Sequence, residues 1–262
     1  MPEIQVNDTT IHYQRSGREG GPRLLLSHSL FFDLSMFEPL IDRLKDHFDI
    51  LAYDHRGQGR SGRAGKLDMD NLTRDAAGLI DALEFGPCLV AGNSMGGFVA
   101  LRLAARYPQL VSGCIVMGSS ADLEHKLAEF EPLVEDLGRN GPAPHIDTLM
   151  YIMFGERIFA DPASEALLTH WRTRMLALHT SIGEAARGVI HRQSVLPEIA
   201  LLEVPLLVLA GEQDHAYSVA LSQQIVEVSG HGDMYVIPGA GHSVALEAPE
   251  AVAQRIRDFA GS

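Results

Sequence analysis

A serine enclosed by glycines is the residue best placed to do chemistry in this chain. Residues 92–97 read Gly-Asn-Ser-Met-Gly-Gly and lie between an apolar run and a helical pattern. A sharp strand-to-helix turn exposes a serine hydroxyl and crowds the positions two residues either side, where only glycine fits. The backbone N–H of Met95 then begins a helix and points toward an anion near the hydroxyl. The pattern predicts that Ser94 is a nucleophile for a carbonyl carbon.

A serine hydroxyl is a poor nucleophile until a base takes its proton, and His242 is the best-placed histidine for this role. It follows the last apolar run, on a glycine-flanked loop just before the closing helical pattern. This position places it at the carboxyl end of a sheet, where Ser94 also lies. By contrast, His231 lies in a polar Gly-His-Gly turn at the other end of that run, where we expect it to be solvated.

An acid should hold the imidazole in the correct tautomer and stabilise its charged form. Asp214 lies just past the apolar run 205–210 and is our candidate. Glu212 is an alternative that falls earlier in the same turn, and Asp122 is a second alternative after the run 111–118.

The elements that must position these side chains alternate between apolar runs and amphipathic helical patterns. The runs predict strands at 4–6, 10–14, 23–28, 48–54, 88–92, 111–118, 204–211 and 234–237. Helical spacing follows at 35–47, 70–83, 95–106, 218–228 and 249–259. Near-continuous apolar strands alternating with helices predict an α/β fold, with a mostly parallel eight-stranded sheet and helices on both faces.

The alternation stops between residues 122 and 195, where no strand is predicted. This block reads as about four helices, at 123–137, 145–154, 162–179 and 182–193, with glycine and proline between them. We expect it to be a helical cap (122–195) inserted into a core domain made of residues 1–121 and 196–262. Because it leaves at the carboxyl end of a strand, it should roof the crevice where ligands bind in such sheets.

Three motifs together carry a resemblance to a known family. Residues 92–97, the segment 54–61 (Asp-His-Arg-Gly-Gln-Gly-Arg-Ser) and Gly-Ala-Gly-His at 239–242 resemble the α/β-hydrolase superfamily over essentially the whole chain. The resemblance implies a triad in the chain order Ser94, Asp214, His242. It also implies an oxyanion hole whose second N–H donor, beside Met95, is that of Leu30 in the loop His28-Ser29-Leu30. This loop, the segment 53–57 and the cap are most similar to 3-oxoadipate enol-lactone hydrolases and small carboxylesterases.

The cap should supply an apolar pocket roof that excludes water from the tetrahedral intermediate. Met150, Phe154 and Trp171 are our candidate substrate-binding residues. A substrate that carries a carboxylate would need a cap arginine turned inward. The cap arginines are Arg157, Arg172, Arg174, Arg187 and Arg192.

No cofactor or metal is expected. Residues 57–62 match G-x-G-x-x-G formally, but loop residues follow the last glycine where a dinucleotide site requires a helix. Cys88 and Cys114 lie in apolar runs and suit core packing better than a disulfide or zinc site.

Composition limits the partners. The formal net charge is −13, which disfavours nucleic acid and anionic membranes. The first residues lack a basic-then-apolar leader, so we expect a cytoplasmic protein whose partner is a small ester or lactone. The oligomeric state stays open.

The expected activity is cleavage of a small ester or lactone through an acyl-enzyme. Three alternatives are compatible with the same strand-to-helix turn at Ser94: a hydrolase of carbon–carbon bonds in ring-cleavage products, a cofactor-free perhydrolase, and a non-catalytic ligand receptor. The first of these usually carries a Ser-Gly-Gly or glycine-rich oxyanion loop, which residues 28–32 do not match.

Overall fold

Eight strands form one sheet in the computed structural model, which describes residues 2–261. The strands are β1 (Glu3–Val6), β2 (Thr9–Gly17), β3 (Arg23–Ser27), β4 (Asp49–Tyr53), β5 (Cys88–Asn93), β6 (Val111–Met117), β7 (Leu206–Gly211) and β8 (Asp233–Ile237). Their spatial order is β1-β2-β4-β3-β5-β6-β7-β8. β2 is antiparallel to both of its neighbours, whereas every pair from β4 to β8 is parallel.

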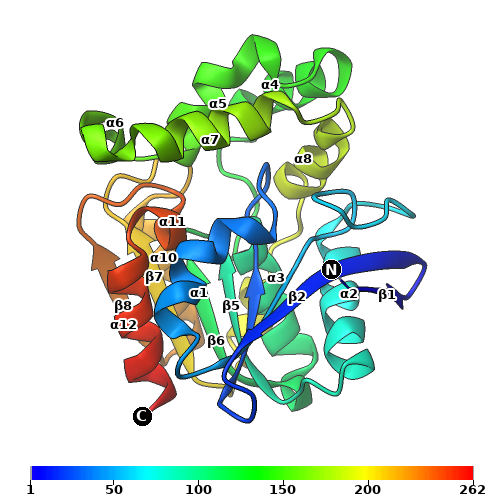
Figure 1. Cartoon of the computed structure of the whole chain (residues 1–262), viewed down its shortest axis with the longest axis vertical. Coiled ribbons are helices and arrows are strands. Elements are labelled where there is room, and N and C mark those ends of the chain that lie inside the picture. The colour runs from blue at the N-terminus through cyan, green and yellow to red at the C-terminus, as the bar shows by residue number, and fades with distance from the viewer. Residues whose placement is uncertain (1, 262) are drawn as a thin grey trace.

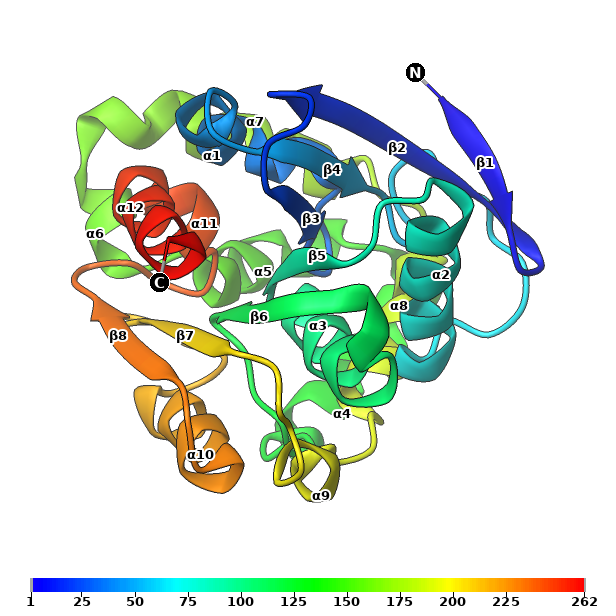
Figure 2. The ribbon, with the colours of Figure 1, turned by 90° about the horizontal axis from the view of Figure 1, so that it is seen from below.

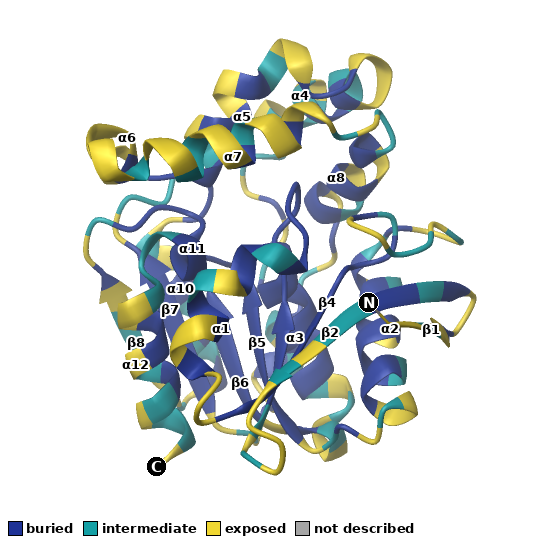
Figure 3. Ribbon diagram, viewed as in Figure 1, coloured by how far each residue is buried: buried dark blue, intermediate teal, exposed yellow. Residues whose placement is uncertain are grey.

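The central strands are apolar on both faces because both faces are covered. Every residue of β4, β5 and β7 is buried, which Figure 3 shows as the dark centre of the molecule. Such strands have no solvated face, so their sequences read as apolar runs rather than as alternating patterns. The predicted mostly parallel sheet is confirmed.

Helices outside the inserted block cover the two faces of the sheet. They are α1 (Glu38–Leu44), α2 (Met69–Ala82), α3 (Met95–Arg106), α9 (Leu196–Ile199), α10 (Val219–Ser229), α11 (Val244–Glu247) and α12 (Pro249–Ala260). α1 and α12 lie on one face, and α2, α3 and α10 lie on the other (Figure 2). The sequence did not predict α11, because a helix of four residues is too short to show periodicity.

A helical layer lies across the carboxyl ends of the strands (Figure 1). It contains α4 (Leu127–Asn140), α5 (Ile146–Met153), α6 (Glu156–Ala160), α7 (Glu165–Leu176) and α8 (Ile182–Ile190). α6 was not predicted as a separate helix, and the helix predicted at 162–179 is shortened to α7 after a 3₁₀ turn at Pro162–Ser164. These short helices bury few residues each, so their periodicity marks their ends poorly.

Gly183 permits the close approach of α4 and α8 within this layer, at the level of Gly138. A Cβ placed on Gly183 of α8 would lie 2.5 Å from the Cα of Gly138 in α4. A Cβ placed on Gly138 would meet nothing within 4 Å. The two positions therefore separate the effect of the helical contact from that of the helical backbone.

Gly183→Ala is expected to lower the free energy of unfolding by about 1–3 kcal/mol, because its methyl group overlaps backbone that cannot move aside cheaply. Gly138→Ala is expected to raise it by about 0.5–1 kcal/mol, because alanine loses less backbone entropy in a helix. Urea unfolding of the two variants and the parent measures both values. Equal effects of the two substitutions would contradict this packing.

Candidate active site

Ser94 stands at the turn between β5 and α3 in a strained conformation. Its φ is 54° and its ψ is −115°, a backbone conformation that residues other than glycine rarely adopt. A Cβ on Gly92 would lie 2.0 Å from the carbonyl oxygen of Gly96, and one on Gly96 would lie 1.9 Å from that of Ser27. Both glycines are therefore sterically required. The turn leaves the Ser94 hydroxyl at the carboxyl edge of the sheet.

The structure brings Ser94, His242 and Asp214 into one hydrogen-bonded chain. Ser94 Oγ lies 2.7 Å from His242 Nε2, and His242 Nδ1 lies 3.0 Å from both carboxylate oxygens of Asp214. A carboxylate can only accept, so Nδ1 carries the proton and Nε2 is free to accept one from Ser94. The His242 side chain is 3% exposed, so these hydrogen bonds are shielded from bulk water.

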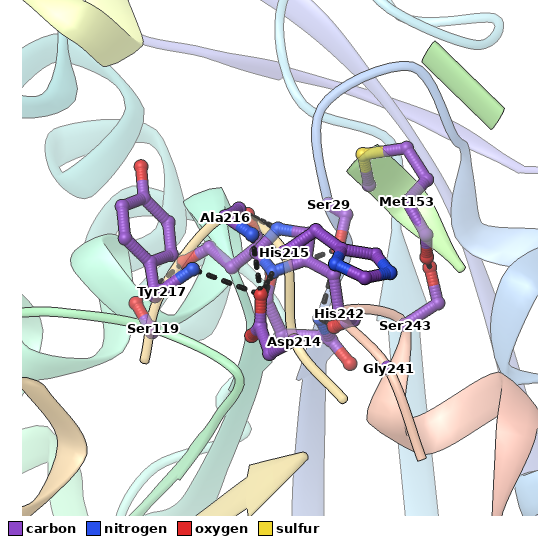
Figure 4. A network of polar contacts seen from close by, with 12 residues as sticks. Ser29, Ser119, Met153, Asp214, His215, Ala216, Tyr217, Gly241, His242 and Ser243 are labelled. Atoms are coloured by element: carbon purple, nitrogen blue, oxygen red, sulfur yellow. Dashed lines mark hydrogen bonds and ion pairs between the residues drawn. The ribbon is translucent and has the colours of Figure 1, made fainter. Parts of the chain in front are cut away.

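The Asp214 carboxylate is fixed from behind by backbone donors. Its Oδ1 accepts the N–H groups of Ala216 and Tyr217, each at 2.8 Å (Figure 4). Charge-assisted bonds of this kind hold the carboxylate rotamer and keep it aimed at His242. The two alternative acids lie elsewhere. Glu212 accepts the N–H of Gly239, and Asp122 accepts the N–H of its neighbour Leu123.

Glu247 fixes the loop that carries His242, and sequence reasoning missed it. Its two carboxylate oxygens accept the N–H groups of Gly155, Gly241 and Ser243 at 3.0 to 3.1 Å. Burial raises the pKa of Glu247 despite these three donors. Gly155 lies between α5 and α6, so one side chain joins the helical layer to the His242 loop. The sequence does show an acidic residue five positions after His242, but this spacing alone does not predict that its carboxylate binds backbone N–H groups.

Asn93 connects the nucleophile turn with both neighbouring loops. Its Nδ2 donates to the His242 carbonyl at 2.9 Å and to Ser29 Oγ at 3.1 Å, and its Oδ1 accepts the Ala245 N–H. Ser29 Oγ in turn donates to the Asn93 carbonyl at 3.2 Å. The Ser29 hydroxyl is thus bonded to this turn and not directed at an oxyanion.

The loop after β3 is held by a neutral histidine. His28 Nε2 accepts the backbone N–H of His55 at 2.9 Å, so its Nδ1 carries the proton and donates to the Ser29 carbonyl at 2.7 Å. Burial lowers the pKa of His28, which keeps the ring neutral. These two bonds fix the turn that leads into Leu30.

The N–H groups of Leu30 and Met95 are free to receive an anion. Among the described residues, neither donates to any acceptor, although both residues are buried. Met95 is the first residue of α3, where an N–H has no partner inside the helix. The next N–H, of Phe31, is instead used by Gln58 Oε1 at 3.2 Å. Gln58 therefore helps to leave Leu30 as the free donor of the loop.

An apolar cavity opens beside Ser94 and His242, beneath the helical layer. Its walls come from the loop after β3 and from α4, α5 and α8, with Tyr217 on the remaining side. The apolar side chains that line it are Leu30, Phe31, Phe130, Leu133, Val134, Leu137, Leu149, Ile152, Met153, Ala186, Val189, Ile190 and Ala216. Such a wall suits hydrocarbon and excludes water.

The three substrate-binding residues predicted from sequence do not line this cavity. Met150, Phe154 and Trp171 are 3%, 0% and 2% exposed, and the rings of Phe154 and Trp171 pack on Phe32. α5 does face the cavity, but through Leu149, Ile152 and Met153. The sequence predicted the helix but not which of its faces lines the cavity. Apolar residues lie on several sides of this short helix, so their spacing does not single out one face.

The cap arginines do not reach the cavity either. Arg157, Arg172, Arg174 and Arg187 have half-buried or exposed side chains, and Arg172 and Arg174 pair with Asp147 and Asp33. Arg192 is turned inward, with its side chain 1% exposed, but it pairs with Glu124 at 2.8 Å.

Other kinds of site find no support in residues 2–261. No group of three or more His, Cys, Asp or Glu side chains is arranged to hold a metal, and no helix is long and apolar enough to cross a membrane. The glycine-rich loop 57–62 turns around Asp54, because a Cβ on Gly59 would lie 2.3 Å from that carboxylate, and the next helix begins only at Met69.

Comparisons with known proteins agree with this geometry. The chain is 28% identical to 3-oxoadipate enol-lactonase 2 of Acinetobacter baylyi, over 95% of this chain and 92% of that protein. It is 26% identical to 2-(acetamidomethylene)succinate hydrolase of Mesorhizobium japonicum, over 98% and 93%. The crystal structure of the enol-lactonase from Burkholderia xenovorans LB400 matches with a TM-score of 0.93 at 25% identity, over all of both chains.

A family model also matches, and its description is "Alpha/beta hydrolase family". The match runs from residue 24 to residue 255, which includes the nucleophile turn, the helical layer and the His242 loop. This chain therefore belongs to the alpha/beta hydrolase family.

Proposed function

We propose that this protein is a serine hydrolase that cleaves a small ester or lactone through an acyl-enzyme, with Ser94 as nucleophile, His242 as base and Asp214 as the acid that orients it. The observation that carries the proposal is the continuous chain from Ser94 Oγ through His242 to Asp214, at 2.7 and 3.0 Å, at the wall of an apolar cavity. The lactonase and hydrolase relatives support the same reaction class.

In the acylation step, Ser94 Oγ attacks the carbonyl carbon while His242 Nε2 takes its proton. Asp214 stabilises the resulting imidazolium through the Nδ1–H bond. The negative charge that develops on the carbonyl oxygen is held by the N–H groups of Leu30 and Met95. Loss of one such donor typically costs about 10²–10³ in rate.

Acylation ends when the tetrahedral intermediate collapses: the bond between its carbon and the leaving oxygen breaks, and His242 gives its proton to that oxygen. A water molecule, deprotonated by the same imidazole, then attacks the acyl carbon and frees Ser94. A lactone keeps its leaving alkoxide tethered to the acyl group, so only water has to enter. The closed apolar wall limits how much water does so.

We also propose that residues 122–195 act as a cap domain on the core domain formed by 1–121 and 196–262. The cap supplies the cavity wall through α4, α5 and α8, and the Glu247 bond to Gly155 ties its position to the His242 loop. The acyl group would then lie under the cap, against the apolar wall of the cavity.

Ser94→Ala is expected to lower kcat for p-nitrophenyl acetate by roughly 10⁴-fold or more, because no other group forms the acyl-enzyme. The same comparison of the parent and the variant is made with γ-lactones, enol-lactones and homoserine lactones as substrates. Ser112→Ala, which changes an exposed serine of β6, is the control and should keep the parent rate.

A fluorophosphonate label on the parent adds an independent readout. Stoichiometric labelling of Ser94 without turnover of any ester or lactone would favour a ligand receptor instead. Turnover of coloured dienoates, or peroxide-dependent halogenation with acetate, in place of ester cleavage would favour the carbon–carbon hydrolase or the perhydrolase.

Asp214→Asn is expected to lower kcat by roughly 10⁴-fold, since an amide can force the wrong imidazole tautomer, and to leave fluorophosphonate labelling slow but present. Glu212→Gln removes a neighbouring carboxylate that, among residues 2–261, bonds only the Gly239 N–H, and this variant should keep a rate within about twofold of the parent. Steady-state kinetics on the best ester measures both. A larger loss from Glu212→Gln than from Asp214→Asn would reassign the acid.

A further inference from the structure

The charge on the cavity wall is carried by an unexpected residue. Among the described residues that line the cavity, Glu124 is the only acidic one, and no arginine or lysine is present. The other polar side chains that line it include Ser94 and His242. The Glu124 side chain has no exposed surface. A carboxylate in such a place is costly unless its oxygens are paired.

Every oxygen of Glu124 is in fact bonded. Oε2 accepts Arg192 Nη1 at 2.8 Å and the Tyr217 hydroxyl at 2.9 Å. Oε1 accepts the backbone N–H of Lys126 at 3.0 Å and lies 3.3 Å from His125 Nδ1. The Lys126 ammonium itself turns away and donates to the His215 carbonyl. Glu124 thus lines the cavity wall, whereas the Arg192 guanidinium that pairs with it does not line the cavity.

Both partners of the pair are charged. Burial alone would raise the pKa of Glu124, but the adjacent Arg192 and the hydrogen bonds together lower it below its ordinary value. Arg192 is held in turn by the carbonyls of Asp122 and Val189 and lies 4.1 Å from the centre of the Phe98 ring. It cannot leave Glu124 to meet a ligand without breaking these contacts.

We infer that the acyl pocket selects uncharged substrates and rejects acyl groups that carry a carboxylate, because Glu124 pairs with Arg192, which alone among the arginines of residues 122–195 is buried, and presents its own negative charge to the cavity. This inference rests on the proposed function, since it assigns the cavity to the acyl group. A substrate carboxylate would lose its water and meet Glu124 at a wall that, among the described residues, no arginine or lysine lines. An ester or lactone with a hydrocarbon or other neutral acyl chain meets only the apolar wall.

Binding to Ser94→Ala protein tests the inference without requiring turnover. Dimethyl succinate and monomethyl succinate have the same acyl carbon chain, and at pH 7.5 they differ by one negative charge. Isothermal titration calorimetry should give a dissociation constant for the diester at least roughly tenfold lower than for the monoester, because the charged end is buried without a partner.

The second comparison moves the charge on the protein. Glu124→Gln, in the Ser94→Ala background, leaves Arg192 uncompensated and should tighten monomethyl succinate by at least roughly tenfold while changing the diester little. Glu135→Gln removes a carboxylate of α4 that pairs with Arg139 and is 45% exposed, so it should leave the ratio of the two dissociation constants unchanged. A thermal melt of each variant checks that it is folded. If Glu124→Gln does not fold, the ligand pair on the Glu124-intact protein decides alone.

Monomethyl succinate binding as tightly as the diester, or no binding of either, would overturn the inference. Turnover by the wild type separates the two proposals. If the diester binds preferentially but releases no methanol, the hydrolase proposal fails and the selectivity stands. If both esters are cleaved with similar kcat/KM, the hydrolase proposal stands and the selectivity fails.

Discussion

The whole site depends on one strained backbone turn. Ser94 has a positive φ, and the two glycines that flank it leave no space for a Cβ against Gly96 and Ser27. Strain of this kind costs about 1–3 kcal/mol and persists only where surrounding structure holds it. Here that structure is the buried sheet, since the Ser94 N–H also donates to the Met117 carbonyl of the next strand at 2.9 Å. The stability of the parallel core is therefore what keeps the hydroxyl in position.

Loops from distant parts of the chain are joined to this turn by a few polar side chains. Asn93 bonds the His242 carbonyl and Ser29, so the His242 loop and the loop after β3 share one anchor. Glu247 bonds the His242 loop and Gly155, so the helical layer shares another. Asn93 is buried and Glu247 is half-buried, and each has several partners, so moving any one loop would leave donors unsatisfied, at a cost of about 1–3 kcal/mol for each buried group.

The sequence predicted the features that depend on local spacing. The sharp turn at Ser94, the strands formed by the apolar runs and the candidate roles of His242 and Asp214 were each predicted from residues near them in the chain, and the structure brings Ser94, His242 and Asp214 together. What the sequence could not give depends on packing between distant segments. The inner face of α5, the pairing of Arg192 with Glu124 and the three donors to Glu247 require knowing which segments meet in space.

Tyr217 connects the Glu124 carboxylate in the cavity wall with Asp214 and His242. Its N–H fixes the Asp214 carboxylate at 2.8 Å, while its hydroxyl donates to Glu124 at 2.9 Å and its ring centre lies 5.4 Å from that of His242. A change at Glu124 therefore reaches Asp214 through a single residue. This coupling gives a physical reason for a paired charge in an otherwise apolar wall, because the pair orients Tyr217, and Tyr217 in turn orients Asp214.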